Sequence, residues 1–421
     1  MRIVAGPTDH VVVVGAGLSG LAAALHLCGR GRSVTVLERA AVPGGRVGRR
    51  DVRGHRLDTG PAVLTMPDVV EETLDAVGAA LDDRLTLTRL DPICRAYLPD
   101  GSALDVRAGR DAVTEALRAF AGPREAARYA RLRDRLARLC QAPYTRLSGA
   151  PALLPGGFGR RFLRAEPSPA LSALAAMDAA GGAWFPHGGM RALPDALAGA
   201  AAGAGVDLRH GTTVSALERH GRRVIAAHTT GGERIPCDAI VLTCAPATAR
   251  RLLGHAPSHP YRAAPSAVVV HLSATGDGPA HHNLLFGDPA SDAPLLVTRP
   301  TATDPALAPG GRQILSVSVP LPRPGDGAKR AAPAYAEETV ALVAARCGLS
   351  GTVETLAAFT SDGAEISGPA LARTADNVVF AGHGAIPGLD VPTALLSGRP
   401  VADRVTGTPV PRPRPYAGIT R

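Results

Sequence analysis

A glycine-rich loop, GAGLSG, lies directly between a run of valines and an alanine-rich segment near the start of the chain. The valine run, Val11–Val14, does not alternate with polar residues, as expected of a strand buried on both faces of a parallel sheet. Residues 21–30 have the composition of a helix. In such a unit Gly15 permits the tight turn, Gly17 lets a pyrophosphate approach the backbone, and Gly20 allows close packing of the helix on the strand. The unit predicts an α/β fold with a Rossmann-like, dinucleotide-binding domain.

The next strand supports this prediction because it ends in an acid. Residues 34–37 form a second β-branched run, and Glu38 follows. At this spacing a carboxylate accepts hydrogen bonds from the ribose hydroxyls of a dinucleotide, and it disfavours the 2′-phosphate of NADP. We also expect contacts from Leu18 and Ser19, at the phosphate end of the helix, and from Arg39. The alternative is a glycine-rich turn without a ligand.

A second glycine turn follows in Val42-Pro-Gly-Gly-Arg46, and the chain continues to Leu57-Asp-Thr-Gly-Pro61. An NAD dehydrogenase has no reason to carry a paired glycine turn with an arginine here. The arrangement resembles flavoproteins of the amine oxidase and phytoene desaturase superfamily, in which the turn runs along the pyrophosphate and flavin. The resemblance implies that FAD is the cofactor and that it is lined by Gly44, Gly45, Arg46, Gly60 and Pro61. The alternative is a surface turn with a solvated arginine.

Two later regions fit the same resemblance. Short strand-like pieces separated by glycine turns occur at 206–208, 213–217, 224–229 and 239–243. They predict a β-meander that returns to a core strand. Residues 377–382 predict a buried strand that ends at Gly382, and a helix is expected to start within residues 389–398. By resemblance, Val214 contacts the adenine side of FAD, and Gly382 and Val391 lie near its ribityl and pyrophosphate end.

Further blocks make the chain resemble bacterial phytoene desaturases and related carotenoid oxidoreductases. They are Ala183-Trp-Phe-Pro-His-Gly-Gly-Met190, His281-His-Asn-Leu-Leu-Phe286, residues 298–304 and residues 381–398. The resemblance implies an enzyme that takes hydride from an allylic carbon of a polyene and forms a conjugated double bond. FAD would be its sole cofactor, an apolar small molecule its substrate, and oxygen or quinone its electron acceptor.

The chain departs from that family in two places. Its helical middle, between about residues 144 and 184, is shorter than in typical members, where this part contributes to the substrate tunnel. Its closing loop carries His383 where relatives commonly have an alcohol or an acid. A flavin amine oxidase or a tailoring oxidase of a smaller metabolite is therefore an alternative. A non-catalytic prenyl-binding carrier on the same fold is another.

Catalytic candidates are few, since flavin dehydrogenation needs geometry more than a strong base. His187 lies between the Trp-Phe-Pro and Gly-Gly turns, and it either transfers a proton or is a hydrogen-bonded turn histidine. His281 and His282 either contact substrate or orient a loop. The remaining candidates are His383, Asp304 and Asp390, and both acids are equally explained as loop or helix caps. No metal site is expected.

A basic helix is predicted over residues 122–139, with its apolar residues at helical spacing and its arginines elsewhere on the surface. This helix and the basic cluster at 159–164 could dock on anionic lipid, or the helix could pack on the core with solvated arginines. The formal net charge of +9 would also suit nucleic acid. However, Lys329 is the only lysine, which indicates a compositional bias, and 3% aromatic residues leave little to stack on bases. We expect no nucleic-acid partner.

Six cysteines lie scattered without CxxC spacing, which disfavours a zinc site or a disulfide framework and fits a reducing cytoplasm. Residues 1–10 lack a signal-peptide pattern, and no apolar run is long enough to span a bilayer. We expect a cytoplasmic protein, or one peripheral to the inner face of the membrane.

The segments predict two domains. The FAD-binding domain comprises residues 1–90, 184–255 and 365–421, and includes the meander. An α+β substrate domain comprises residues 91–183 and 256–364. Within the first domain, the proline- and arginine-rich residues 409–421 are expected to form a disordered tail.

Overall fold

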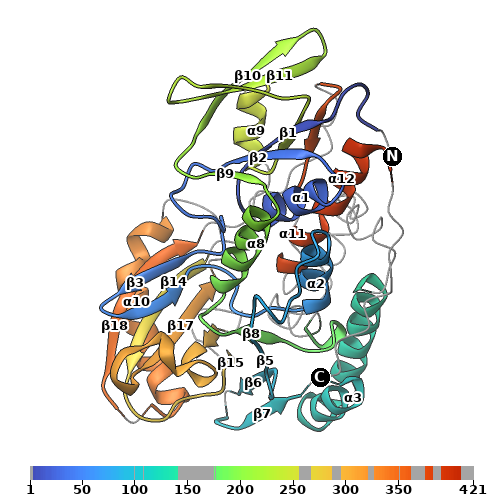
Figure 1. Cartoon of the computed structure of the whole chain (residues 1–421). Helices are drawn as coiled ribbons and strands as arrows, with labels where there is room; N and C mark the ends of the chain where they lie inside the picture. Colours follow the sequence, from blue (N-terminus) through green and yellow to red (C-terminus); the bar gives the residue numbers. More distant parts are fainter. Residues whose placement is uncertain are drawn as a thin grey trace.

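The computed structural model describes residues 3–98, 100–107, 109–140, 175, 177–255, 267–286, 295–320, 327–349, 351–361, 375–382 and 390–408 (Figure 1). Several predictions fall outside these residues. They concern His383, the cluster at 159–164, most of the short helical middle and the tail at 409–421.

The valine run forms the central strand of a five-stranded parallel sheet, in the order β19-β13-β1-β2-β9. The strands are β1 (His10–Val14), β2 (Ser33–Leu37), β9 (Asp207–Arg209), β13 (Ala239–Leu242) and β19 (Val378–Phe380). Val11, Val12 and Val13 are fully buried, because layers of the molecule cover both faces of β1. The Rossmann-like α/β prediction is therefore confirmed, and the sheet draws its strands from the start, middle and end of the chain.

Helix α1 (Leu18–Cys28) is buried along residues 18–27. It contacts α8 (Ala192–Gly203), α11 (Asp390–Leu396) and α12 (Gly398–Thr406). The small alanine side chains of α1 allow these three helices to approach it closely. A β-carbon on Gly398 would lie 2.5 Å from the carbonyl carbon of Ala22, so α12 begins at a glycine that lets two backbones meet. The helix expected to start within residues 389–398 is confirmed as α11, and the second helix α12 follows it directly.

The predicted meander is an antiparallel sheet of β10 (Val214–His220), β11 (Arg223–Thr229) and β12 (Arg234–Pro236). The predicted pieces 213–217 and 224–229 correspond to β10 and β11, whereas 206–208 belongs to β9 of the parallel sheet and β12 was not predicted. Asn377 attaches it to the parallel sheet. This fully buried side chain donates to the carbonyls of Val224 at 2.6 Å and Asp238 at 2.7 Å, and accepts from the Val224 N–H at 2.9 Å. Asn377 thus fixes the meander beside β13 and β19.

A second, mixed sheet has seven strands in the order β18-β14-β17-β16-β15-β6-β7. They are β6 (Cys94–Tyr97), β7 (Ala103–Val106), β14 (Ala267–Ala274), β15 (His282–Leu285), β16 (Leu295–Thr298), β17 (Gln313–Pro320) and β18 (Val353–Ser361). One face packs against α10 (Gly327–Arg346) through Val343 and the following Cys347. The opposite face includes Leu284 and Ile314, which join the main core around α1 and α8.

Shorter elements complete the described part of the chain. They are the hairpin β3 (Arg49–Val52) and β4 (His55–Asp58), the pair β5 (Leu87–Arg89) and β8 (Trp184–Pro186), α2 (Pro67–Asp75), α9 (Pro246–Leu252), and the 3-10 turns η1 (Pro300–Ala302), η2 (Pro305–Leu307) and η3 (Pro309–Gly311). In Figure 1 the β3–β4 hairpin, which forms a sheet of its own, lies beside the second sheet.

The basic helix belongs to α3 (Arg110–Cys140), which is broken at Gly122, with φ 86° and ψ 170°. The predicted Gly-Pro start is confirmed as the beginning of the second half, although a helical first half precedes it. Ala126, Tyr129, Leu132 and Leu136 are buried, as their spacing predicted. None of the helices that the structure describes is both long and apolar enough to cross a membrane.

Candidate functional site

The predicted phosphate loop connects β1 to α1 through backbone contacts that exclude side chains. Gly15 has a positive φ of 110°, and its N–H donates to the Leu37 carbonyl at 2.9 Å. A β-carbon on Gly20 would lie 1.9 Å from the carbonyl oxygen of Gly15. The loop therefore needs glycine at both ends, as the motif predicted.

The carboxylate of Glu38, the residue that follows β2, contacts the backbone of this loop. It is buried, with one oxygen accepting from the Ala16 N–H at 2.7 Å and the other from the Ala40 N–H at 2.8 Å. A carboxylate has about four lone-pair sites, so two protein donors leave acceptor capacity on each oxygen. Glu38 can therefore fix the loop and still accept hydrogen bonds from ribose hydroxyls.

The second glycine turn packs against the first. The Gly44 N–H donates to the Ala16 carbonyl at 2.8 Å, and a β-carbon on Gly45 would lie 3.2 Å from the Cα of Gly17. The turn also touches the segment after β4, since a β-carbon on Gly60 would lie 2.3 Å from the Arg46 carbonyl oxygen. The Arg46 side chain is exposed, and Pro61 is half-buried.

Gly382, which lies far along the chain from the first two glycine segments, also contacts the start of α1. A β-carbon on Gly382 would lie 2.5 Å from the Ser19 hydroxyl, in the first turn of α1. Leu18, Ser19 and Val391 are buried. The structure thus brings three separately predicted glycine segments together at one helix start.

The start of α1 fits a bound pyrophosphate. Gly17 is its N-cap, no side chain caps it by a hydrogen bond, and its first turn carries no acidic residue. The first N–H groups of a helix and the positive end of its dipole favour phosphate when no side chain occupies them. The residues present therefore fit the FAD that the sequence predicts.

The predicted adenine contact, Val214, lies at the start of the meander. The Thr212 N–H donates to the Glu38 carbonyl at 2.8 Å, two residues before Val214. Val214 itself is buried and pairs with Thr229. Arg39 is exposed beside this segment. The predicted adenine contact therefore lies next to the predicted ribose contact.

Asp58 is a residue whose role the sequence did not reveal. Its carboxylate accepts from the backbone N–H groups of Met190 at 2.8 Å and Arg191 at 3.3 Å. Burial raises the pKa of Asp58 to about 6, against the opposing effect of these hydrogen bonds. A β-carbon on Gly189 would lie 2.9 Å from the carboxylate, so the Gly-Gly turn permits this contact. The sequence feature that could have indicated this role is the acidic residue within the block Leu57–Pro61.

His187 and Asp304 lie on the two sides of that turn. The His187 side chain is exposed, and its Nε2 lies 3.0 Å from the Thr88 hydroxyl, an arrangement that favours the turn-histidine alternative. Asp304 caps η2 through the Ala306 N–H at 3.1 Å and accepts from the Gly188 N–H at 2.7 Å. The cap alternative for Asp304 is thereby confirmed. The side chain of Asp390 lies outside the described residues.

The adjacent histidines are both buried. His281 lies 4.5 Å from Phe185 between ring centroids, and its Nδ1 is 2.6 Å from the Thr303 hydroxyl. Burial lowers the pKa of His281 to about 3 and that of His282 to about 4, so both rings are neutral near pH 7. The His281 contacts fit the loop-orienting alternative. Among the described residues, no three His, Cys, Asp or Glu side chains are grouped to hold a metal ion.

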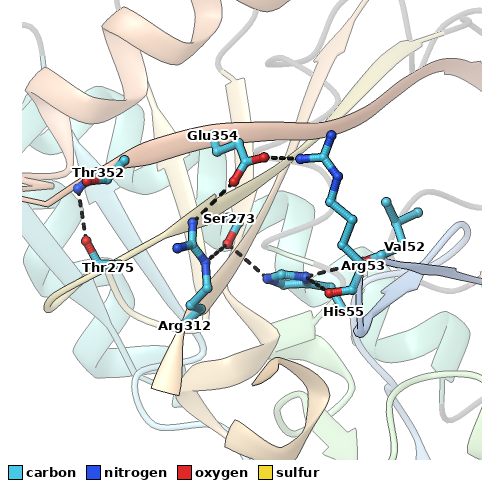
Figure 2. Close-up of polar contacts among 8 residues, drawn as sticks. All are labelled: Val52, Arg53, His55, Ser273, Thr275, Arg312, Thr352 and Glu354. Carbon is cyan, nitrogen blue, oxygen red and sulfur yellow. Dashed lines mark hydrogen bonds and ion pairs between the residues drawn. The ribbon is translucent and has the colours of Figure 1, made fainter. Parts of the chain in front are cut away.

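A polar network joins the β3–β4 hairpin to the second sheet (Figure 2). The buried Ser273 hydroxyl lies 2.9 Å from His55 Nε2 and 2.5 Å from Arg312 Nε. Glu354 forms ion pairs with Arg53, at the hairpin tip, and with Arg312 at 3.5 Å. Because Arg312 can only donate, the Ser273 hydroxyl is free to donate to His55. His55 lies on β4 three residues before Asp58, so the network positions the segment that leads to Gly60.

Comparison with known proteins agrees with this geometry. A profile of flavin-containing amine oxidoreductases matches residues 18–343. A phytoene dehydrogenase of Streptomyces griseus is 42% identical, with 99% of each chain covered. A hydroxyneurosporene desaturase of Cereibacter sphaeroides is 35% identical over 66% of each chain. In fold, the chain is similar to an oxidoreductase of Methanosarcina mazei, with a TM-score of 0.69 at 18% identity, covering 94% of this chain and 100% of that one.

The alignment with the Streptomyces protein also bears on chain length. It runs over 506 positions, whereas this chain has 421 residues. The relative therefore carries residues that this chain lacks, as expected if part of the chain is shortened.

Proposed function

This chain belongs to the family of flavin-containing amine oxidoreductases, and we propose that within it the enzyme desaturates a carotenoid or another linear polyisoprenoid. It is an FAD-dependent oxidoreductase similar to phytoene desaturases, and its substrate is an apolar isoprenoid. The amine oxidase, tailoring oxidase and carrier alternatives are not favoured, since the relatives are a phytoene dehydrogenase and a hydroxyneurosporene desaturase by name.

FAD, when bound, supplies the hydride acceptor of such a reaction. The protein's own residues bind and orient it. Glu38, which has acceptor capacity left beside its contact with Ala16, would accept hydrogen bonds from the ribose, and the N–H groups at the start of α1 would hold the pyrophosphate. Gly44 and Gly45 would leave room along the cofactor, and Gly60 packs on the backbone of Arg46. Asp58 holds the Gly-Gly turn in place through the backbone of Met190.

One observation carries the proposal: the glycine loop, the second glycine turn and Gly382 converge at the start of α1, above the buried carboxylate of Glu38. Gly382 is separated from the other two segments by more than 300 residues of sequence. The glycines let the backbones of these segments pack closely while the first N–H groups of α1 stay uncapped by side chains, which is the arrangement that a pyrophosphate needs.

The test is to purify the protein, record the oxidised-flavin absorption, and incubate it with phytoene under air. We expect stoichiometric FAD and products with longer conjugation on chromatography. Colourless protein would overturn the cofactor assignment. A flavin-loaded protein that desaturates neither phytoene nor a shorter linear polyene would overturn the substrate class.

The electron acceptor and the role of His187 belong to the same proposal. We propose that oxygen or a quinone reoxidises the enzyme, which anaerobic turnover with and without added quinone distinguishes. A proton-transfer role for His187 predicts that His187→Gln lowers kcat and flattens its pH profile, whereas a turn histidine bonded to Thr88 predicts little change.

We further propose that α3 contacts an anionic membrane surface. Its buried Ala126, Tyr129, Leu132 and Leu136 face the core, while Arg124, Arg131 and Arg138 are exposed at helical spacing on another side. Such a row attracts anionic headgroups, from which an apolar substrate could be drawn. Figure 1 places α3 and the meander at opposite ends of the molecule.

Vesicle flotation tests this contact. Changing the three α3 arginines to glutamine should reduce binding to phosphatidylglycerol vesicles severalfold at low salt. Changing the exposed meander residues Arg219, Arg222 and Arg234 removes the same charge at the other end and should leave binding unchanged. Equal losses in both triple variants would contradict docking through α3.

The two-domain division stays a proposal. It is supported by the second sheet, which combines β6 and β7 with strands from residues 267–361, and by the parallel sheet, which takes its strands from the other segments.

A further inference from the structure

Strand β17 presents two different faces. Leu315, Val317 and Val319 are buried against the α10 side of the sheet. Ser316 and Ser318 point to the opposite face and remain partly exposed, although β17 lies between β14 and β16. The face shared by Ser316 and Ile314 looks towards the main core, and at the two serines the core does not cover it completely.

Polar residues cross this face in one row. The register pairs His282 with Thr298, Thr298 with Ser316, and Ser316 with His271. Paired residues on neighbouring strands point to the same face, and strands lie about 4.8 Å apart. The row is therefore roughly 14 Å long, from His282 to His271.

The contact at the His271 end of the row is short and partly buried. His271 Nδ1 lies 2.7 Å from the Ser316 hydroxyl, and the His271 side chain is fully buried. Burial lowers the pKa of His271 to about 4, so the ring is neutral near pH 7. His271 Nε2 and His282 Nδ1 make no hydrogen bond in the described structure. Such groups are costly in an apolar interior, which calls for an explanation.

The surroundings of the row are apolar. Val269 and Leu296 lie on the same face, and Ala357 follows His271 on β18. This apolar lining suits the hydrocarbon part of a substrate. The hydroxyl and imidazole groups of the row, in contrast, can hydrogen-bond only with a substrate that carries a polar group. The face also adjoins the network of Figure 2, because Ser273 lies two residues from His271 and contacts the hairpin leading to Gly60.

We propose that Ser316, held in place by His271, is a hydrogen-bonding subsite for a hydroxyl or carbonyl oxygen of the substrate. The preferred substrate class is then an oxygen-bearing linear polyisoprenoid rather than a pure hydrocarbon. This inference rests on the proposed function and deepens it. Ser316 makes the contact with the substrate oxygen, and His271 is a positioning residue that orients the serine hydroxyl.

The test compares neurosporene with hydroxyneurosporene on the FAD-loaded enzyme, by titration of the flavin spectrum and by initial rates. We expect the wild type to bind the hydroxylated compound more tightly. Ser316→Ala should weaken that binding about three- to tenfold, the value of one net hydrogen bond, and leave neurosporene binding unchanged. His271→Phe should have the same selective effect, and Ser316→Thr, which retains the hydroxyl, should restore the preference.

Ser318→Ala is the matched control, since it removes a hydroxyl from the same strand and face but not from the His271 contact. Flavin content and melting temperature identify a variant that fails to fold. Equal affinity of the wild type for both compounds, or equal effects of Ser316→Ala and Ser318→Ala, would overturn the subsite. Selective binding without any desaturated product would overturn the proposed function and leave the subsite standing.

Discussion

A β-carbon on Gly20 would lie 1.9 Å from the carbonyl oxygen of Gly15, so helix α1 and its loop touch through backbone atoms alone. No rotation of a side chain can relieve such an overlap. The observed approach of the loop to α1, whose first N–H groups we propose to bind phosphate, therefore requires glycine at position 20.

Gly20→Ala should consequently cost both cofactor and stability. The added methyl forces the loop away from α1, and we expect FAD content below about a tenth of wild type, with a loss of roughly 2 kcal/mol or more in the free energy of unfolding. Gly203→Ala in α8 is the control, because nothing lies within 4 Å of its β-carbon. It should be neutral or slightly stabilising. Flavin absorbance and urea denaturation measure both effects, and normal flavin content in Gly20→Ala would contradict the close contact.

Glu38→Gln should weaken FAD binding at least about tenfold. Glutamine offers one acceptor oxygen, so its amide nitrogen would face the N–H of Ala16 or Ala40. Titration of the apoprotein with FAD, followed by fluorescence, gives the Kd. Glu233→Gln removes an exposed carboxylate that pairs with Arg209 and should leave the Kd unchanged. An unchanged Kd in Glu38→Gln would remove Glu38 from the cofactor site.

Ser273→Ala should destabilise the protein by about 1–3 kcal/mol, because His55 Nε2 and Arg312 Nε would both lose their partner in a buried contact. Thr275→Val removes a single, more exposed hydrogen bond with the Thr352 N–H and should cost less (Figure 2). Urea denaturation compares the two. If Ser273→Ala costs no more than Thr275→Val, the network does not stabilise the docking of the hairpin.

The buried His26 should make stability depend on pH. Burial, assisted by Arg30 and Arg399, lowers its pKa to about 3, whereas an unfolded histidine titrates near 6.5. Between these values the unfolded chain binds more protons, so the free energy of unfolding falls as pH falls, by at most about 1.4 kcal/mol per pH unit for this residue. His26→Gln should therefore flatten the difference between urea midpoints at pH 5 and pH 7.5. An unchanged difference would mean that His26 is protonated in the fold.

The parts of the site that were predictable are those whose geometry is local. The glycine loop, Glu38 and the paired glycines each depend on the backbone of a few neighbouring residues, so residue type and spacing indicate them. The same holds for the arginine-bearing helix after Gly122, whose buried residues recur at helical spacing. Helix ends were less predictable, because the junction between α11 and α12 depends on how closely Gly398 meets α1.

The remaining contacts join residues that the chain brings together only on folding. Asp58 receives the backbone of Met190, Asp304 receives the backbone of Gly188, and Asn377 holds Val224. An aspartate or asparagine in a loop can hydrogen-bond with many different groups. The residues next to it in the sequence do not indicate which of these groups it contacts. The polar row through Ser316 and His271 likewise depends on strand register, which the alternation of one strand cannot reveal.

The sequence alone thus determined the α/β class and the dinucleotide-binding loop, because a phosphate loop needs small residues and an acid at fixed spacing along one strand–loop–helix unit. The second glycine turn, through the family it resembles, indicated FAD. Tertiary structure decided which segments complete the site and which polar residues lie side by side on the face of the second sheet that looks towards the main core. The physical reason is that backbone turns are set by adjacent residues, whereas a side chain's partner is set by how the two sheets and the hairpin between them pack.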